Sequence, residues 1–322
     1  MVRTAQGDVR GVHLDNGSLY WGGLAYAAPP VGEARWRPPQ PPAVRTSRFD
    51  AADPGAPCAQ PAFGRADGGG VLGSEDCLTL NIHAPQGAEG APVMVWIHGG
   101  GQYAGAARDY DGSVLAVRED VIVVTINYRL GPFGWFHHPA LRNERSDAPT
   151  GQFAVLDMIA ALEWVRDNIE EFGGDPGRVT IFGESAGGQN VYALVLAQAA
   201  GGLFHGAIAQ SGGFWNMSLA QAVNPVDAEP PGTRASASEI LAHWLIDAGQ
   251  AQDRDAALAL LAAMEPGELT AFMRGLTTEA VLAPYLDQPD LGYDMPSVVL
   301  DGVIVSEDGH AAQFRSGAYN QT

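Results

Sequence analysis

Lysine is absent from this sequence of 322 residues, so all 18 of its basic side chains are arginines. They face 37 aspartates and glutamates, which gives a formal net charge of −19. A surface with that charge repels phosphate backbones and anionic lipid headgroups. The composition therefore argues against nucleic acid as a partner, and the acidic surface needs no role beyond solubility.

Long apolar runs are also missing. The longest, residues 256–264, is far too short to span a bilayer, and residues 1–7 lack the apolar core of a signal peptide. We expect no membrane span and, by default, a cytoplasmic protein, unless an export signal has been removed. No motif indicates a cofactor or a metal, and the oligomeric state cannot be read from the sequence.

Cysteine is scarce, with only Cys58 and Cys77 in the chain. Two thiols in a chain of this length are usually ordinary buried residues. These two, however, bracket a glycine-rich loop at residues 63–73, where a disulfide would contribute about 3 kcal/mol by closing the loop. A disulfide would in turn favour an oxidising compartment.

Two hydrophobic patterns, one typical of strands and one typical of helices, alternate along the chain. Apolar or alternating runs of strand type occupy residues 78–83, 92–97, 121–127, 178–182 and 206–210. Between them, residues 155–169 place apolar side chains at helical spacing until Gly173 and Gly174 end the helix, and residues 191–200 are again helical. This alternation predicts an α/β fold with a mostly parallel central sheet flanked by helices. We expect one domain over residues 1–322, with a helical insert at 220–295.

The strongest chemical signal is the pattern Gly-x-Ser-x-Gly at residues 183–187, between the strand at 178–182 and the following helix. A sharp turn from strand to helix strains the backbone at the serine, requires small neighbours and exposes the hydroxyl. The helix N-terminus also favours developing negative charge. The pattern therefore predicts Ser185 as a nucleophile, and the alternative is a glycine-rich turn with an incidental serine.

A second signal follows the strand at 92–97, where His98 precedes three glycines. Acyl transfer needs backbone N–H donors directed at the tetrahedral oxyanion, and glycines let a backbone approach that closely. By itself the run is equally compatible with a flexible turn, but the serine turn makes an oxyanion-binding loop the better interpretation. We expect His98, inside this loop, to be structural.

Long ordered motifs at residues 75–81, 127–131, 164–176 and 179–188 resemble the type-B carboxylesterase and cholinesterase family. The resemblance implies an α/β-hydrolase fold and ester hydrolysis through an acyl-enzyme, with general small esters as substrates. By motif, Ser185 would be the nucleophile, and Gly100, Gly101 and Ala186 would supply the oxyanion amides. The short loop between the cysteines lacks the tryptophan that stacks on choline in the cholinesterase branch.

The resemblance implies further pairings. Cys58 and Cys77 would form the first disulfide of the family. Arg35 and Glu75 would form its buried ion pair, the alternative being unrelated surface charges. Glu184 and Ser211 would lie behind the residues that contact the substrate and hold them in place. Ser211 would be a buried serine, the alternative being an ordinary residue at a strand end.

The acid and the histidine that complete a catalytic triad in this family have no counterpart here. No Gly-x-Asn-x-x-Glu pattern occurs, and no histidine stands in a family-like context. We therefore expect a fragment that ends before these residues and lacks the C-terminal part of the fold.

Two other interpretations stay open. A hormone-sensitive-lipase-like esterase could close its triad internally, through Asp287 or Asp294 and His310. A non-catalytic adhesion or scaffold module of cholinesterase type is also possible, although such modules usually lose the nucleophile that this sequence retains.

Overall fold

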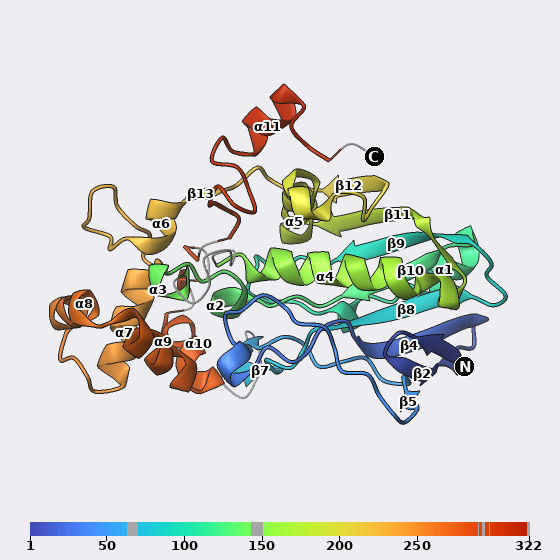
Figure 1. Ribbon diagram of the computed structural model, residues 1–322, viewed down its shortest axis with the longest axis horizontal. Helices are drawn as coiled ribbons and strands as arrows, with labels where there is room; N and C mark the ends of the chain where they lie inside the picture. The colour runs from blue at the N-terminus through green and yellow to red at the C-terminus, as the bar shows by residue number, and fades with distance from the viewer. Residues whose placement is uncertain (63–69, 143–150, 289, 292–293, 296, 321–322) are drawn as a thin grey trace.

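The structure is a computed structural model that describes residues 1–62, 70–142, 151–288, 290–291, 294–295 and 297–320. Its centre is a sheet of seven described strands in the order β12-β11-β9-β10-β8-β4-β3 (Figure 1). These strands are β3 (Val12–His13), β4 (Ser18–Ala25), β8 (Thr79–Pro85), β9 (Ala91–Ile97), β10 (Ile122–Ile126), β11 (Gly174–Glu184) and β12 (Gly206–Gln210). The strands predicted from the sequence are all present.

The sheet is mixed rather than mostly parallel, which corrects one expectation. Strands β12, β11, β9 and β10 pair in parallel, whereas β10–β8, β8–β4 and β4–β3 are antiparallel pairs. The cause lies in the connections. Each step among β9, β10, β11 and β12 crosses over through a helix and so preserves direction. The chain instead reverses from β8 into β9 through residues 86–90, and no α-helix lies among the described residues between β3 and β8.

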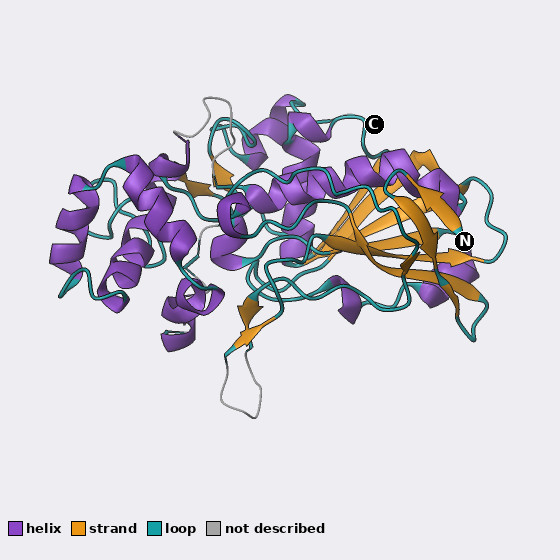
Figure 2. Ribbon diagram, turned by 60° about the horizontal axis from the view of Figure 1, so that its bottom comes forward, coloured by secondary structure: helices purple, strands orange, loops and turns teal. Residues whose placement is uncertain are grey.

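Helices cover the two faces of this sheet. Helix α1 (Ser113–Glu119) packs with Met94 and Val123 on one face, while α4 (Phe153–Asn168) and α5 (Ala186–Leu196) cover the other. Figure 2 shows the helices on both sides of the strands. The apolar side of α4 is buried, as its spacing predicts, and the helix continues into η3 (Ile169–Phe172). Gly173 then ends it with φ 86°, a conformation that favours glycine.

Short elements complete the framework. The strands outside the central sheet are β1 (Val2–Thr4), β2 (Gly7–Arg10), β5 (Phe49–Asp50), β6 (Gln60–Pro61), β7 (Val71–Leu72), β13 (Met217–Ser218) and β14 (Val299–Leu300). The remaining helices near the sheet are η1 (Gly32–Ala34), η2 (Ala107–Asp109), α2 (Gly131–Gly134), α3 (Pro139–Arg142), η4 (Gln198–Ala200) and α11 (His310–Ser316).

A group of helices follows β13 in the chain. It comprises α6 (Leu219–Val223), α7 (Ala237–Asp247), α8 (Arg254–Ala263), α9 (Pro266–Gly275) and α10 (Thr278–Asp287). Both views place α7 to α10 at the end of the molecule away from the N-terminus (Figures 1 and 2). Their positions agree with the predicted insert, whose boundaries at 220 and 295 stay a prediction. Among the helices that the structure describes, none is long and apolar enough to cross a membrane.

A disulfide joins Cys58 to Cys77, as expected, and both residues are buried. The two strands between the cysteines, β6 and β7, pair as a small antiparallel ribbon. Residues 63–69 of the glycine-rich loop lie outside the described part of the chain.

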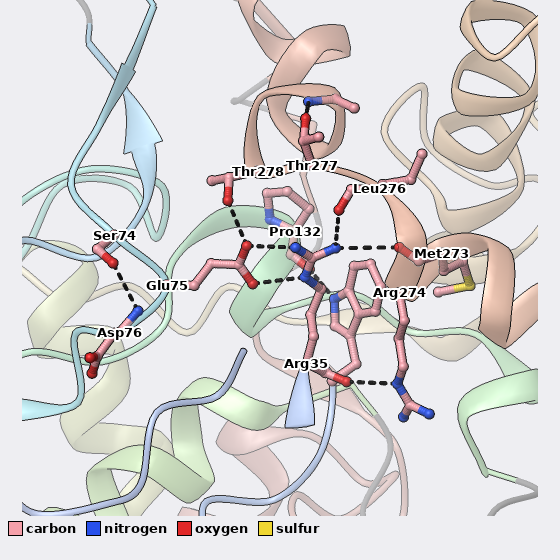
Figure 3. Close-up of polar contacts among 12 residues, drawn as sticks. Arg35, Ser74, Glu75, Asp76, Pro132, Met273, Arg274, Leu276, Thr277 and Thr278 are labelled. Carbon is pink, nitrogen blue, oxygen red and sulfur yellow. Dashed lines mark hydrogen bonds and ion pairs between the residues drawn. The ribbon is translucent and has the colours of Figure 1, made fainter. Parts of the chain in front are cut away.

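A buried ion pair ties this region to the helices of the predicted insert. Arg35 donates two hydrogen bonds to Glu75, from Nε to Oε2 at 2.7 Å and from Nη2 to Oε1 at 2.6 Å (Figure 3). The two side chains are only 7% and 8% exposed. The guanidinium also donates to the carbonyl of Leu276 at 2.7 Å, just after α9, and Thr278 in α10 donates to Glu75 at 2.6 Å. The expected buried pair is therefore confirmed. Its hydrogen bonds hold the junction of α9 and α10 against the segment that carries Glu75.

We predict that Glu75→Gln lowers the free energy of unfolding by about 3 kcal/mol, because it leaves the Arg35 charge buried without a counter-ion. Urea denaturation with equal m-values in both proteins is the measurement. Arg35→Met/Glu75→Leu should be less damaging than Glu75→Gln, since the buried charge is then absent.

The matched control is Arg166→Met. Arg166 pairs with Asp167 at 2.7 Å, but these side chains are about half exposed, at 49% and 53%. Its effect should stay below about 1 kcal/mol. Equal losses of unfolding free energy in Glu75→Gln and Arg166→Met would show that the buried pair contributes no more to stability than an exposed one.

Candidate active site

Ser185 occupies the single residue between β11 and α5. Its backbone has φ 57° and ψ −119°, a region that a non-glycine residue enters at a cost of about 1–3 kcal/mol. Two hydrogen bonds hold it there: its N–H donates to the carbonyl of Gln210 at 2.9 Å, and its carbonyl accepts from Gln189 N–H at 3.0 Å. The side chain is exposed. This is the strained turn that the Gly-x-Ser-x-Gly pattern predicts.

The two glycines of the pattern are required by close approach to β9. A Cβ at Gly187 would lie 2.0 Å from the carbonyl oxygen of Ile97. A Cβ at Gly183 would lie 2.6 Å from the Gly187 carbonyl carbon and 2.7 Å from the same Ile97 oxygen. Any side chain at either position would push the serine turn away from the sheet.

The glycine run after β9 lies directly against this turn. Because β9 and β11 pair in parallel, with Ile97 opposite Gly183, both strands end at the same level of the sheet. A Cβ at Gly99 would come within 3.3 Å of the Ser185 Cβ and 2.7 Å of the Glu184 carbonyl oxygen. The structure thus brings together the two segments that the glycine-rich motifs mark separately in the sequence.

The backbone of the glycine run is turned sharply. Gly100 and Gly101 have φ 111° and 64°. In the part of the chain that the structure describes, the N–H groups of Gly100, Gly101 and Ala186 have no hydrogen-bond acceptor. Ala186 begins α5, so its N–H belongs to the positive end of that helix. Donors of this kind beside an exposed serine hydroxyl suit a negatively charged oxygen.

His98 is buried beneath this turn. Its ring stacks on Tyr128 with centroids 4.5 Å apart, and Nδ1 lies 2.8 Å from the carbonyl oxygen of Gly99. Burial lowers the pKa of His98 to about 4, so the ring is neutral at neutral pH. These contacts agree with the structural role that we expected for it.

Glu184 and Ser211, the two residues expected to support the site, are both exposed. The buried position considered for Ser211 is therefore wrong in this structure, where Ser211 follows the edge strand β12 with φ 52°. What supports Ser185 there is the backbone carbonyl of Gln210, not the neighbouring hydroxyl. A supporting role for Glu184 stays a prediction.

The alternative internal triad is not assembled. Asp294 pairs with Arg234, whose Nε lies 2.5 Å from Oδ2, and Asp287 is exposed at the end of α10. His310 is fully buried at the start of α11, neither of its ring nitrogens is hydrogen-bonded to a described residue, and burial lowers its pKa to about 4. Among the described residues, no histidine is hydrogen-bonded to Ser185, and no group of three metal-ligating side chains comes together.

Comparison with known proteins adds to this geometry. Residues 1–279 match the model of the carboxylesterase family. This chain belongs to the carboxylesterase family. It is 47% identical over 229 residues to the para-nitrobenzyl esterase of Bacillus subtilis, and 41% identical over 244 residues to carboxylesterase 1D of Rattus norvegicus. These alignments cover 70% and 69% of this chain but 46% and 41% of the relatives.

Solved structures of the family agree on the fold. A PNB esterase superimposes with a TM-score of 0.77 at 35% identity, over 99% of this chain and 61% of its own. A Geobacillus stearothermophilus carboxylesterase gives 0.76 at 33% identity, over 98% and 60%. The α/β-hydrolase fold expected from the sequence is therefore confirmed, and this carboxylesterase-family chain spans about half the length of the curated relatives it matches.

The buried His98 generates a prediction on stability and pH. Its pKa of about 4 in the folded protein lies below the ordinary 6.5, so the unfolded chain binds the proton more readily. The free energy of unfolding should therefore fall between about pH 6.5 and 4, by up to about 3 kcal/mol from this residue.

In His98→Asn, whose amide can still donate to Gly99, that part of the pH dependence should disappear. Denaturation from pH 7.5 to 4 measures it, with the exposed His13→Asn as control. An unchanged slope in His98→Asn would contradict the buried neutral ring.

Proposed function

We propose that the protein is a serine carboxylesterase that hydrolyses small carboxylic esters through an acyl-enzyme on Ser185. The observation that carries the proposal is the contact between the strained Ser185 turn and the Gly99–Gly101 run, in a chain of the carboxylesterase family. The relatives para-nitrobenzyl esterase and carboxylesterase 1D are named for ester hydrolysis, which supports the same reaction class.

Each residue then has a defined part in the reaction. The Ser185 hydroxyl oxygen attacks the ester carbonyl carbon and forms a tetrahedral intermediate. The N–H groups of Gly100, Gly101 and Ala186 bind its oxyanion, and removing one such donor typically costs about 10²–10³ in rate. The intermediate expels the alcohol and leaves an ester on Ser185, which water then cleaves. A base must accept the serine proton and pass it to the departing alcohol, and we assign that role to none of the described residues.

The other interpretations have less support. The internal triad of the lipase-like alternative is contradicted by the Asp294–Arg234 pair and by the enclosed ring of His310. An adhesion or scaffold module has no use for a strained, exposed serine beside a glycine run whose amides at Gly100 and Gly101 find no acceptor among the described residues. A small ester as the substrate is supported by membership of the carboxylesterase family and by its para-nitrobenzyl esterase relative.

We predict that Ser185→Ala, in the protein as its gene encodes it, reduces hydrolysis of p-nitrophenyl butyrate by at least about 10⁴-fold, because the covalent step is lost. Labelling by a fluorophosphonate should vanish with it. Both assays are compared with Ser47→Ala, which alters an exposed serine on a distant loop.

The exposed Ser47 should be replaceable without loss of rate. A Ser185→Ala enzyme that still shows a burst of p-nitrophenol would rule out the assignment. A wild-type protein that binds the ester without cleaving it would favour a scaffold module.

A further inference from the structure

Two buried amide side chains connect the glycine run to the helix that follows Ser185. Gln102 Nε2 donates to Asn190 Oδ1 at 2.7 Å, and Asn190 Nδ2 donates back to Gln102 Oε1 at 3.1 Å. Gln102 is 2% exposed and Asn190 is fully buried. A reciprocal pair of this kind fixes both partners in distance and in orientation.

The same amide group reaches the peptide of Ala186. Gln102 Nε2 lies 3.3 Å from the Ala186 carbonyl oxygen, in the residue whose N–H we assigned to the oxyanion. Gln102 itself follows Gly101 directly. The side chain therefore bridges the two backbone segments that must act together, Gly100–Gly101 on one side and Ala186 on the other.

The backbone at Gln102 needs this support. Its φ of 69° is a left-handed conformation that a residue other than glycine adopts only when its surroundings impose it. The Gln102 carbonyl accepts a hydrogen bond from Gly131 N–H at 2.8 Å. The backbone of Gln102 is thus anchored to the start of α2, and its side chain is anchored to α5 through Asn190.

We propose that Gln102 and Asn190 are positioning residues that set the distance between the Gly100–Gly101 amides and the Ala186 amide. The proposal rests on the proposed function, since it assigns a role within the same oxyanion site. The pair touches no substrate; it acts by fixing where the donors lie. Donors displaced by a fraction of an ångström lose much of their effect on a developing charge.

The test uses the apolar near-isosteres Gln102→Met and Asn190→Leu, their double variant, and the exchanged pair Gln102→Asn/Asn190→Gln. We expect kcat on p-nitrophenyl butyrate to fall about 10–100-fold in each single variant, with KM changed less than about twofold. The double variant should be no worse than the singles, because either change breaks the same pair. The exchanged pair should restore kcat to within about tenfold.

Hydrogen exchange supplies a readout independent of turnover. The amides of Tyr103 and Ala104, which donate to the Gly100 carbonyl, and of Gly131, which donates to Gln102, should exchange faster in the single variants. Amides of β9, such as Val95, should keep their wild-type rates. Gln250→Met, at an exposed glutamine far from the site, is the control for the glutamine-to-methionine change.

Single variants whose kcat stays within twofold of wild type overturn the proposal, whether or not the hydrogen exchange of the three amides changes. The pair would then stabilise the fold without positioning the oxyanion donors. Unchanged exchange at the three amides, or additive losses in the double variant, also overturns it. If Ser185→Ala retains activity, the proposed function fails and this proposal falls with it; if Ser185→Ala is inactive, the pair variants judge this proposal alone.

Discussion

The structure depends on the parallel pairing of β9 with β11, in the register that sets Ile97 opposite Gly183. Each strand ends there and passes into a sharply turned segment, so the register alone places the glycine run against the serine turn. The glycines at 99, 183 and 187 serve this contact, since a Cβ at any of them would lie within 2.7 Å of backbone oxygen. The chemistry of the site is thus a consequence of strand register.

Two further constraints hold the surroundings of the site. The Cys58–Cys77 disulfide closes the segment that carries Glu75, and the Arg35–Glu75 pair joins that segment to the turn between α9 and α10 (Figure 3). Burial of a charged pair adds little net stability by itself, but loss of one partner is costly. The pair therefore acts as a constraint on how the helices after β13 sit against the sheet framework.

The sequence predicted the parts of the molecule that follow from local pattern. Strand runs, the α4 spacing, the serine turn and the glycine run all carry their signal within about ten residues. The antiparallel direction of β8 relative to β10 and β4 was missed, because nothing in an isolated strand says in which direction its neighbour runs. Gln102 and Asn190 were missed because they stand 88 residues apart, and neither carries a signal alone. The exposure of Ser211 likewise depends on β12 lying at the edge of the sheet.

We propose that Ser185 and the amides of Gly100, Gly101 and Ala186 act on one substrate carbonyl. A crystal structure of the protein after reaction with a fluorophosphonate is the sharpest test, because the bound phosphonyl oxygen imitates the oxyanion. We expect a covalent bond to Ser185 Oγ and a phosphonyl oxygen about 2.7–3.1 Å from these amide nitrogens. An adduct on another residue, or an oxygen directed to solvent away from all three amides, would contradict it.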